Sequence, residues 1–202
     1  LNYKGTVAIA PASNLASILT IGEQQASTLP INYQIQMLAQ LDTYTALIVA
    51  GMQGHNKSVT YNEVFKNDTV ILAPIAEAEC SSTVGVQLGT AMSIYAAGIG
   101  QGTLTGYGRL QSGFMSIPVI DTFLKKDSQP GLAPLNKKVF IYQGEADTTV
   151  PKAATDLLIA SMKANGTSAS NIQYTTSAAW DHGTVYTQNY TSFVDNIDSL
   201  FQ

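Results

Sequence analysis

The clearest hydrophobic pattern in the chain is an unbroken run of β-branched, aromatic and aliphatic residues, Val139–Tyr142. Such a run is typical of a strand that is buried on both faces of a parallel sheet. The polar segment after it contains Asp147 and ends at Pro151, which suits the first position of a helix because proline lacks the N–H that would be unpaired there. A helix is therefore predicted next, ending at Asn165–Gly166. Its predicted apolar face consists of Ala153, Ala154, Leu157, Leu158 and Met162.

A second strand and a second helix are predicted in the remainder of the chain. Ile172, Tyr174 and Thr176 alternate with other positions, which is typical of a strand. A loop that contains His182 follows this strand. The apolar positions of the last predicted helix are Tyr186, Tyr190, Phe193, Val194, Ile197 and Phe201. Alternating strands and helices of this kind predict an α/β fold with a parallel sheet.

Asp147 and His182 are the candidate catalytic residues. Each follows a predicted strand, and function in open α/β sheets gathers beyond the carboxyl ends of the strands. A nucleophilic serine needs a base to accept its proton, and an acid to hold that base in the correct tautomer. His182 and Asp147 suit these two roles and occur in the order acid then histidine, but the chain contains no G-x-S-x-G motif for the nucleophile.

The segment Gly144–Pro151, which has the pattern G-x-x-D-x-x-V-P, and the loop around His182 resemble the C-terminal part of the α/β-hydrolases. Within that superfamily the similarity is greatest to secretory lipases and esterases, in which a strand and a turn of small residues precede a helical lid. Gly5–Ser13 resembles that strand and turn. The resemblance implies a partial α/β-hydrolase parallel sheet of few strands, with residues 1–13 and 130–202 as the core portion and residues 14–129 as a largely helical lid insertion.

The same resemblance implies a serine carboxylic-ester hydrolase that acts on acyl esters or lipids and is secreted or periplasmic. The serine and the oxyanion-hole amides are expected outside this chain, before Leu1, so the chain alone is expected to be inactive. Its expected partner is the missing N-terminal segment or a second copy of the chain. Two alternatives remain open, a peptidase of the prolyl-oligopeptidase type and a non-catalytic half-domain that serves binding or assembly.

Composition narrows the possible ligands and partners. Hydrophobic residues make up 45% of the 202 residues and charged residues 12%, with a net charge of −4 and no basic run, which argues against nucleic acid as a partner. No apolar stretch reaches the ~18 residues of a membrane span. Two histidines and one cysteine cannot form a multi-His or Cys-rich zinc site. The glycine-rich residues 98–113 lack G-x-G-x-x-G, so neither a metal nor a dinucleotide cofactor is expected.

Helical signals predominate between the two core segments. Pro30 is placed to open a helix that runs through Leu41, and Thr60–Glu63 has the sequence of a capping box. The small residues of 82–97 predict a further helix, whereas residues 98–113 are expected to form a mobile loop.

Overall fold

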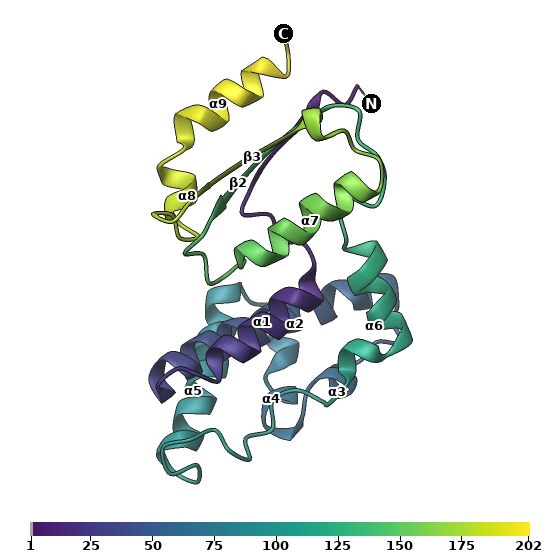
Figure 1. The fold of residues 1–202 in the computed structure, drawn as a ribbon. Coiled ribbons are helices and arrows are strands. Elements are labelled where there is room, and N and C mark those ends of the chain that lie inside the picture. The colour runs from purple at the N-terminus through teal and green to yellow at the C-terminus, as the bar shows by residue number, and fades with distance from the viewer. Residues whose placement is uncertain (1) are drawn as a thin grey trace. The chain divides into compact units, whose positions relative to one another are not determined.

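The computed structural model describes residues 2–202 (Figure 1). The chain divides into two compact units, which are treated separately here. Unit 1 comprises Leu1–Ile18 and Leu124–Gln202, and unit 2 comprises Leu19–Phe123. The predicted core portion, residues 1–13 and 130–202, has limits that lie a few residues inside those of unit 1.

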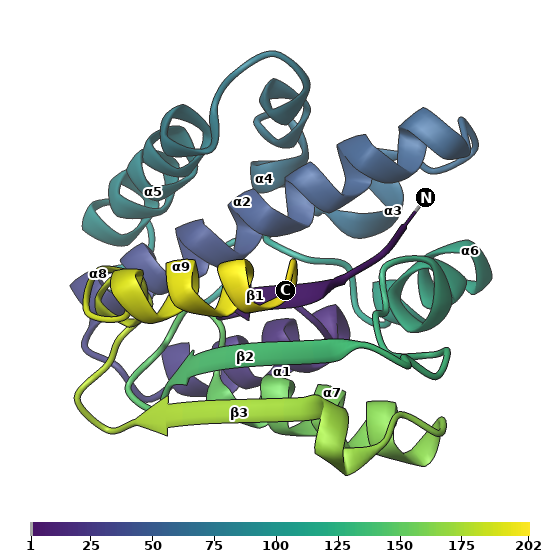
Figure 2. The same cartoon turned by 90° about the horizontal axis from the view of Figure 1, so that it is seen from above.

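Unit 1 contains a small sheet of three parallel strands in the order β1-β2-β3 (Figure 2). These strands are β1 (Gly5–Ile9), β2 (Lys138–Gly144) and β3 (Ile172–Ser177). Helix α7 (Lys152–Ala164) connects β2 to β3, which makes a β-α-β unit. The molecule is thus a mixed α/β protein with a small parallel sheet, as the sequence predicts, and within residues 2–202 β1 and β3 are the edge strands.

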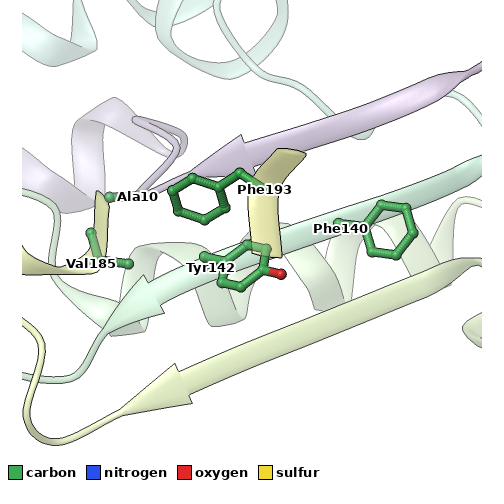
Figure 3. Packing of buried hydrophobic residues seen from close by; sticks show 5 residues of the cluster. All are labelled: Ala10, Phe140, Tyr142, Val185 and Phe193. Atoms are coloured by element: carbon green, nitrogen blue, oxygen red, sulfur yellow. The ribbon is translucent and has the colours of Figure 1, made fainter. Parts of the chain in front are cut away.

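The central strand β2 contributes to two apolar clusters of unit 1, because successive side chains of a strand point to opposite faces. Phe140 and Tyr142 pack on one face with Val185 and Phe193 (Figure 3). The rings of Tyr142 and Phe193 meet edge to face, with their centroids 4.6 Å apart. On the opposite face, β2 and α7 pack against each other through Val139, Ile141, Leu158, Ile159 and Met162. The unbroken apolar run therefore reflects a strand covered on both sides.

Helix α7 follows the prediction in place but not in detail. Pro151 is the N-cap residue and not the first helical residue. The buried face of the helix contains Thr155, whereas Ala153 and Leu157 are exposed. The predicted apolar face is thus wrong at two positions, because a buried threonine occupies part of the contact with β2.

The predicted C-terminal helix is divided into two. Helix α8 (Thr184–Thr187) is followed by a break at Gln188 and Asn189, and α9 (Tyr190–Ser199) then contacts β1. Of the predicted apolar face only Phe193 is buried. The exposed apolar members are Tyr186, Tyr190, Val194, Ile197 and Phe201.

Unit 2 is helical. Its longest helix, α2 (Ile31–His55), extends well beyond the predicted limit and packs along α5 (Ser81–Ala97). The two helices approach closely because α5 presents glycines to α2, and a Cβ on Gly89 would stand 3.4 Å from the Cβ of Ala39. The capping box is confirmed at the start of α3, where Thr60 N–H donates to Glu63.

The remaining helical segments are short. Helix α1 (Leu15–Ala26) begins in unit 1 and ends in unit 2. No helix within residues 2–202 is long and apolar enough to cross a membrane. The other segments are α3 (Tyr61–Val64), α4 (Asn67–Val70), η1 (Ala73–Glu77), η2 (Phe114–Ser116), α6 (Pro118–Thr122), the π-helical turn η3 (Phe123–Asp127) and η4 (Ala169–Asn171).

A buried ion cluster holds the glycine-rich segment of unit 2. The Arg109 guanidinium donates to both carboxylate oxygens of Asp42 and to both of Glu23. Burial raises the pKa of Asp42 from 3.8 to about 6, although Arg109 acts in the opposite direction. Asp42 lies on α2, so the cluster joins the loop to the main helix of this unit.

Substituting adjacent leucines of α7 tests its corrected orientation. Leu158 is 4% exposed and Leu157 is 49% exposed. Leu158→Ala is expected to lower the free energy of unfolding by about 2–5 kcal/mol, because it leaves a cavity in the core. Leu157→Ala is expected to change it by less than about 1 kcal/mol. Urea unfolding followed by the fluorescence of Trp180 measures both, and equal losses would contradict this orientation.

The pH dependence of stability in an Asp42 variant tests the buried ion cluster. Between the ordinary aspartate pKa of 3.8 and the folded-state pKa of about 6, the folded chain binds more protons at Asp42 than the unfolded chain does. The stability contribution of this group is therefore lost as pH rises through that interval. Wild-type protein is expected to lose stability relative to Asp42→Asn between about pH 4 and pH 7, as followed by helical circular dichroism. A difference that stays constant with pH would refute this expectation.

Candidate active site

The carboxyl ends of β2 and β3 bring two loops of unit 1 together. The last paired residues of the two strands are Gly144 and Ser177. Beyond them, Glu145 N–H donates to the carbonyl of Ser177 at 3.0 Å, and Ala146 N–H donates to the carbonyl of Trp180 at 3.1 Å. These bonds fix the turn that carries Asp147 against the loop that carries His182.

The close approach of these loops requires a glycine at position 144. A Cβ built on Gly144 would collide with the backbone carbonyl of Trp180 and lie close to that of Asp181. The obstructing atoms belong to the backbone, so a side-chain rotation cannot relieve the contact. The glycine of the G-x-x-D pattern thus allows the histidine loop to cross the end of β2.

Asp147 and His182 lie in contact, as the sequence predicts. The Nδ1 atom of His182 is 2.8 Å from Oδ2 of Asp147. The Asp147 side chain is completely buried, whereas that of His182 is 48% exposed. An ionised carboxylate can only accept hydrogen bonds, so Nδ1 of the neutral ring carries the proton and Nε2 is left as an acceptor.

Four donors surround the Asp147 carboxylate. The backbone N–H groups of Thr149 and Val150 both donate to Oδ1 at 2.8 Å. The side-chain amide of Gln143 and the ring of His182 contact Oδ2. One carboxylate oxygen of Asp147 therefore stabilises its own turn, and the other holds the His182 ring.

Gln143 is part of this site, and the sequence analysis did not identify it. It is completely buried at the end of β2, and its Oε1 accepts a hydrogen bond from the Thr155 hydroxyl at 2.7 Å. The only sign of Gln143 in the sequence is a polar residue near the end of the apolar strand. Its position, two residues after Ile141, places it on the same face of the strand as Ile141.

Asp181 is adjacent to His182 but serves the backbone. Its Oδ1 accepts hydrogen bonds from the N–H groups of Gly183 and Thr184 and from the Thr184 hydroxyl. The backbone and hydroxyl hydrogen bonds from Thr184 lower the pKa of this exposed carboxyl below its usual range. Asp181 thus holds the backbone just before and at the start of α8, and Asp147 is the acid that contacts the ring.

No serine within residues 2–202 hydrogen-bonds to His182. Ser177 ends β3 and accepts from the N–H of Ala179, and Ser112 lies exposed in unit 2. Ser13 follows β1, between the left-handed residues Ala10 (φ 42) and Asn14 (φ 53). Its hydroxyl is completely buried and has no hydrogen-bond partner within the described residues, so it is not accessible to a substrate.

No cluster of three His, Cys, Asp or Glu side chains in residues 2–202 is arranged to hold a metal ion. Unit 2 has a groove of about 850 Å³ between α2 and α5, and its lining residues carry no charge. The exposed apolar side chains Val86 and Ile94 form part of its wall.

Comparisons with known proteins give information on the fold. No protein-family model matches the chain, and no curated protein matches it. A crystal structure described as a "putative hydrolase" from Legionella pneumophila is similar, with a TM-score of 0.64 and 12% sequence identity. The alignment covers 97% of this chain and 48% of that chain, so this chain spans about half the length of the structure that it matches. At this identity the similarity concerns the fold alone, a mixed α/β fold that the two chains share.

Substituting each aspartate tests which one orients His182. Asp147→Ala is expected to shift the neutral ring from the Nδ1–H towards the Nε2–H tautomer, because the acceptor for the Nδ1 proton is removed. Asp181→Ala is expected to weaken the start of α8 and leave the tautomer unchanged. Nitrogen-15 NMR of the ring measures the ratio of the two forms. The reverse result would assign the orienting role to Asp181.

Proposed function

We propose that this chain is the acid- and base-bearing portion of a serine carboxylic-ester hydrolase of the lipase or esterase type. The observation that carries the proposal is the buried Asp147 carboxylate against Nδ1 of the half-exposed His182 ring. A serine nucleophile needs such an acid and base, and in open α/β sheets functional groups gather beyond the carboxyl ends of the strands. The distant similarity in fold to the structure described as a "putative hydrolase" from Legionella pneumophila also supports the proposal.

In the proposed reaction, Nε2 of His182 accepts the proton of a serine hydroxyl as the serine oxygen attacks the ester carbonyl. The same nitrogen then donates the proton to the leaving alcohol, which leaves an acyl group on the serine. In the second half of the reaction, Nε2 accepts a proton from water as the water attacks the acyl-enzyme, and it returns that proton to the serine oxygen as the carboxylic acid is released. Asp147 keeps the Nδ1 proton in place and stabilises the imidazolium that forms in each step. The His182 ring is partly exposed, and its Nε2 has no hydrogen-bond partner in residues 2–202. Nε2 is therefore free to accept a proton, as a general base must.

The serine and the oxyanion-hole amides are proposed to lie on a polypeptide segment other than residues 1–202. This follows from the absence of a G-x-S-x-G motif and from the burial of Ser13. The similar solved structure is about twice as long, which leaves room for such a segment.

That segment is also the proposed partner of unit 1. Edge strand β1 has a row of backbone groups on the side away from β2, and α9 contacts β1. Such edges are normally paired or covered in folded proteins. The exposed apolar face of α8 and α9 offers side chains that a further layer would bury, from Tyr186 to Phe201.

The proposed substrate is an ester with an apolar acyl group. The uncharged groove of unit 2 supports this choice, because it offers apolar wall and no partner for an ionic group. Unit 2 is accordingly proposed to act as the lid of the enzyme.

A serine-directed fluorophosphonate probe tests where the nucleophile lies. Residues 1–202 alone are expected to take up no label and to hydrolyse no short p-nitrophenyl ester, because no accessible serine contacts His182. Stoichiometric labelling of one serine in this chain would contradict the placement of the nucleophile on another segment.

A polypeptide that joins residues 1–202 to the proposed serine-bearing segment provides the positive control. It is expected to be labelled at a serine outside residues 1–202 and to hydrolyse the ester. His182→Ala should lower kcat by about 10²–10⁴-fold, whereas the matched loop variant Asp181→Ala should retain most of the activity. A longer polypeptide that folds but remains unlabelled would favour the non-catalytic alternative.

A further inference from the structure

We infer that Gln143 and Thr155 are positioning residues that set the tautomer of His182 through Asp147. The inference rests on the proposed function and extends it to two residues that contact neither a substrate nor the histidine. Its basis is a buried chain of hydrogen bonds that runs from α7 through β2 to the Asp147 carboxylate.

The acceptors around Gln143 determine the orientation of its amide. Its Nε2 lies 2.9 Å from the carbonyl of Val150, 3.1 Å from that of Gly144 and 3.3 Å from Oδ2 of Asp147. All three atoms can only accept hydrogen bonds, so an amide rotated by 180° would bring its oxygen against three acceptors. The nitrogen therefore faces the acid turn.

Thr155 fixes the position of the amide oxygen of Gln143. Its hydroxyl donates to Oε1 of Gln143 at 2.7 Å, and both side chains are completely buried. A buried carbonyl oxygen without a donor is costly, so the hydroxyl makes the observed amide orientation the favourable one. Because Thr155 lies one turn into α7, the helix that follows the acid turn also fixes that turn.

At the active site, these hydrogen bonds restrict rotation of the Asp147 carboxylate. The backbone N–H groups of Thr149 and Val150 hold Oδ1. Within residues 2–202, the other oxygen contacts the Gln143 amide and the His182 ring alone. The amide also bonds to Val150, so it fixes the turn and the carboxylate together. Without it, the carboxylate can rotate away from Nδ1, and the ring can adopt the Nε2–H tautomer, which cannot accept a proton from a serine.

The test measures the ring tautomer by nitrogen-15 NMR in residues 1–202, which requires no nucleophile. Thr155→Val removes the donor and keeps the size of the side chain, and Thr155→Ser restores the donor. Gln143→Met removes the amide. We expect the ratio of Nδ1–H to Nε2–H at His182 to fall roughly tenfold in Thr155→Val and Gln143→Met and to recover in Thr155→Ser. A tenfold change corresponds to about 1.4 kcal/mol.

Two controls separate positioning from a general loss of stability. Leu158→Ala weakens the same helix through its apolar contact with β2, and it should lower the unfolding midpoint while leaving the tautomer ratio unchanged. His55, the other histidine of the chain, lies at the end of α2 and should give the same signals in every variant. If Gln143→Met does not fold, the comparison of Thr155→Val with Thr155→Ser carries the test.

The outcomes distinguish the inference from the proposed function. An unchanged ratio in Thr155→Val, and in Gln143→Met if it folds, together with a changed ratio in Asp147→Ala, would overturn the positioning role and leave the Asp147–His182 pair in place. An unchanged ratio in Asp147→Ala would show that the pair does not form in solution, and both the proposed function and this inference would then be wrong. A ratio that falls equally in Leu158→Ala would also overturn the positioning role.

Discussion

The arrangement of the candidate site depends on two parallel strands that end at the same level. Gly144 and Ser177 are the last partners of β2 and β3, and the backbone bonds beyond them continue the contact into the loops. Since Gly144 has no Cβ, the carbonyl of Trp180 can lie directly over the end of β2. Asp147 and His182 meet because this backbone framework holds their loops together, and their own hydrogen bond then completes it.

Much of unit 1 was predictable from the sequence, because each of its elements has a local signal. The unbroken apolar run marks β2, and the order of acid and histidine after successive strands predicts the Asp147–His182 contact. The helix face was less predictable. Thr155 occupies a core position because Oε1 of Gln143 accepts a hydrogen bond from its hydroxyl, and hydrophobicity patterns cannot reveal a buried hydrogen bond between two polar side chains. Leu157 was assigned to the core in its place.

The C-terminal segment shows a different limit of prediction. Its apolar residues recur at helical spacing, and the helices form, but five of those side chains remain exposed in the described chain. The spacing of apolar residues predicts a helix face that should be buried, but it does not identify the segment that buries it. The same is true of β1, in which the five residues Gly5–Ile9 are all only partly buried. Both elements agree with the proposal that a further segment completes unit 1.

The two buried aspartates of the chain differ in how their negative charge is compensated. Burying a carboxylate is costly unless it is paired and hydrogen-bonded. Asp42 is paired with the permanent cation of Arg109, which neutralises its charge. Asp147 is surrounded by neutral donors, two backbone N–H groups and the Gln143 amide, and within residues 2–202 His182 is its only potentially cationic partner. Its negative charge therefore remains available to stabilise an imidazolium when His182 accepts a proton. An arginine in the place of Gln143 would satisfy the same oxygen, but it would neutralise the charge on which that stabilisation depends.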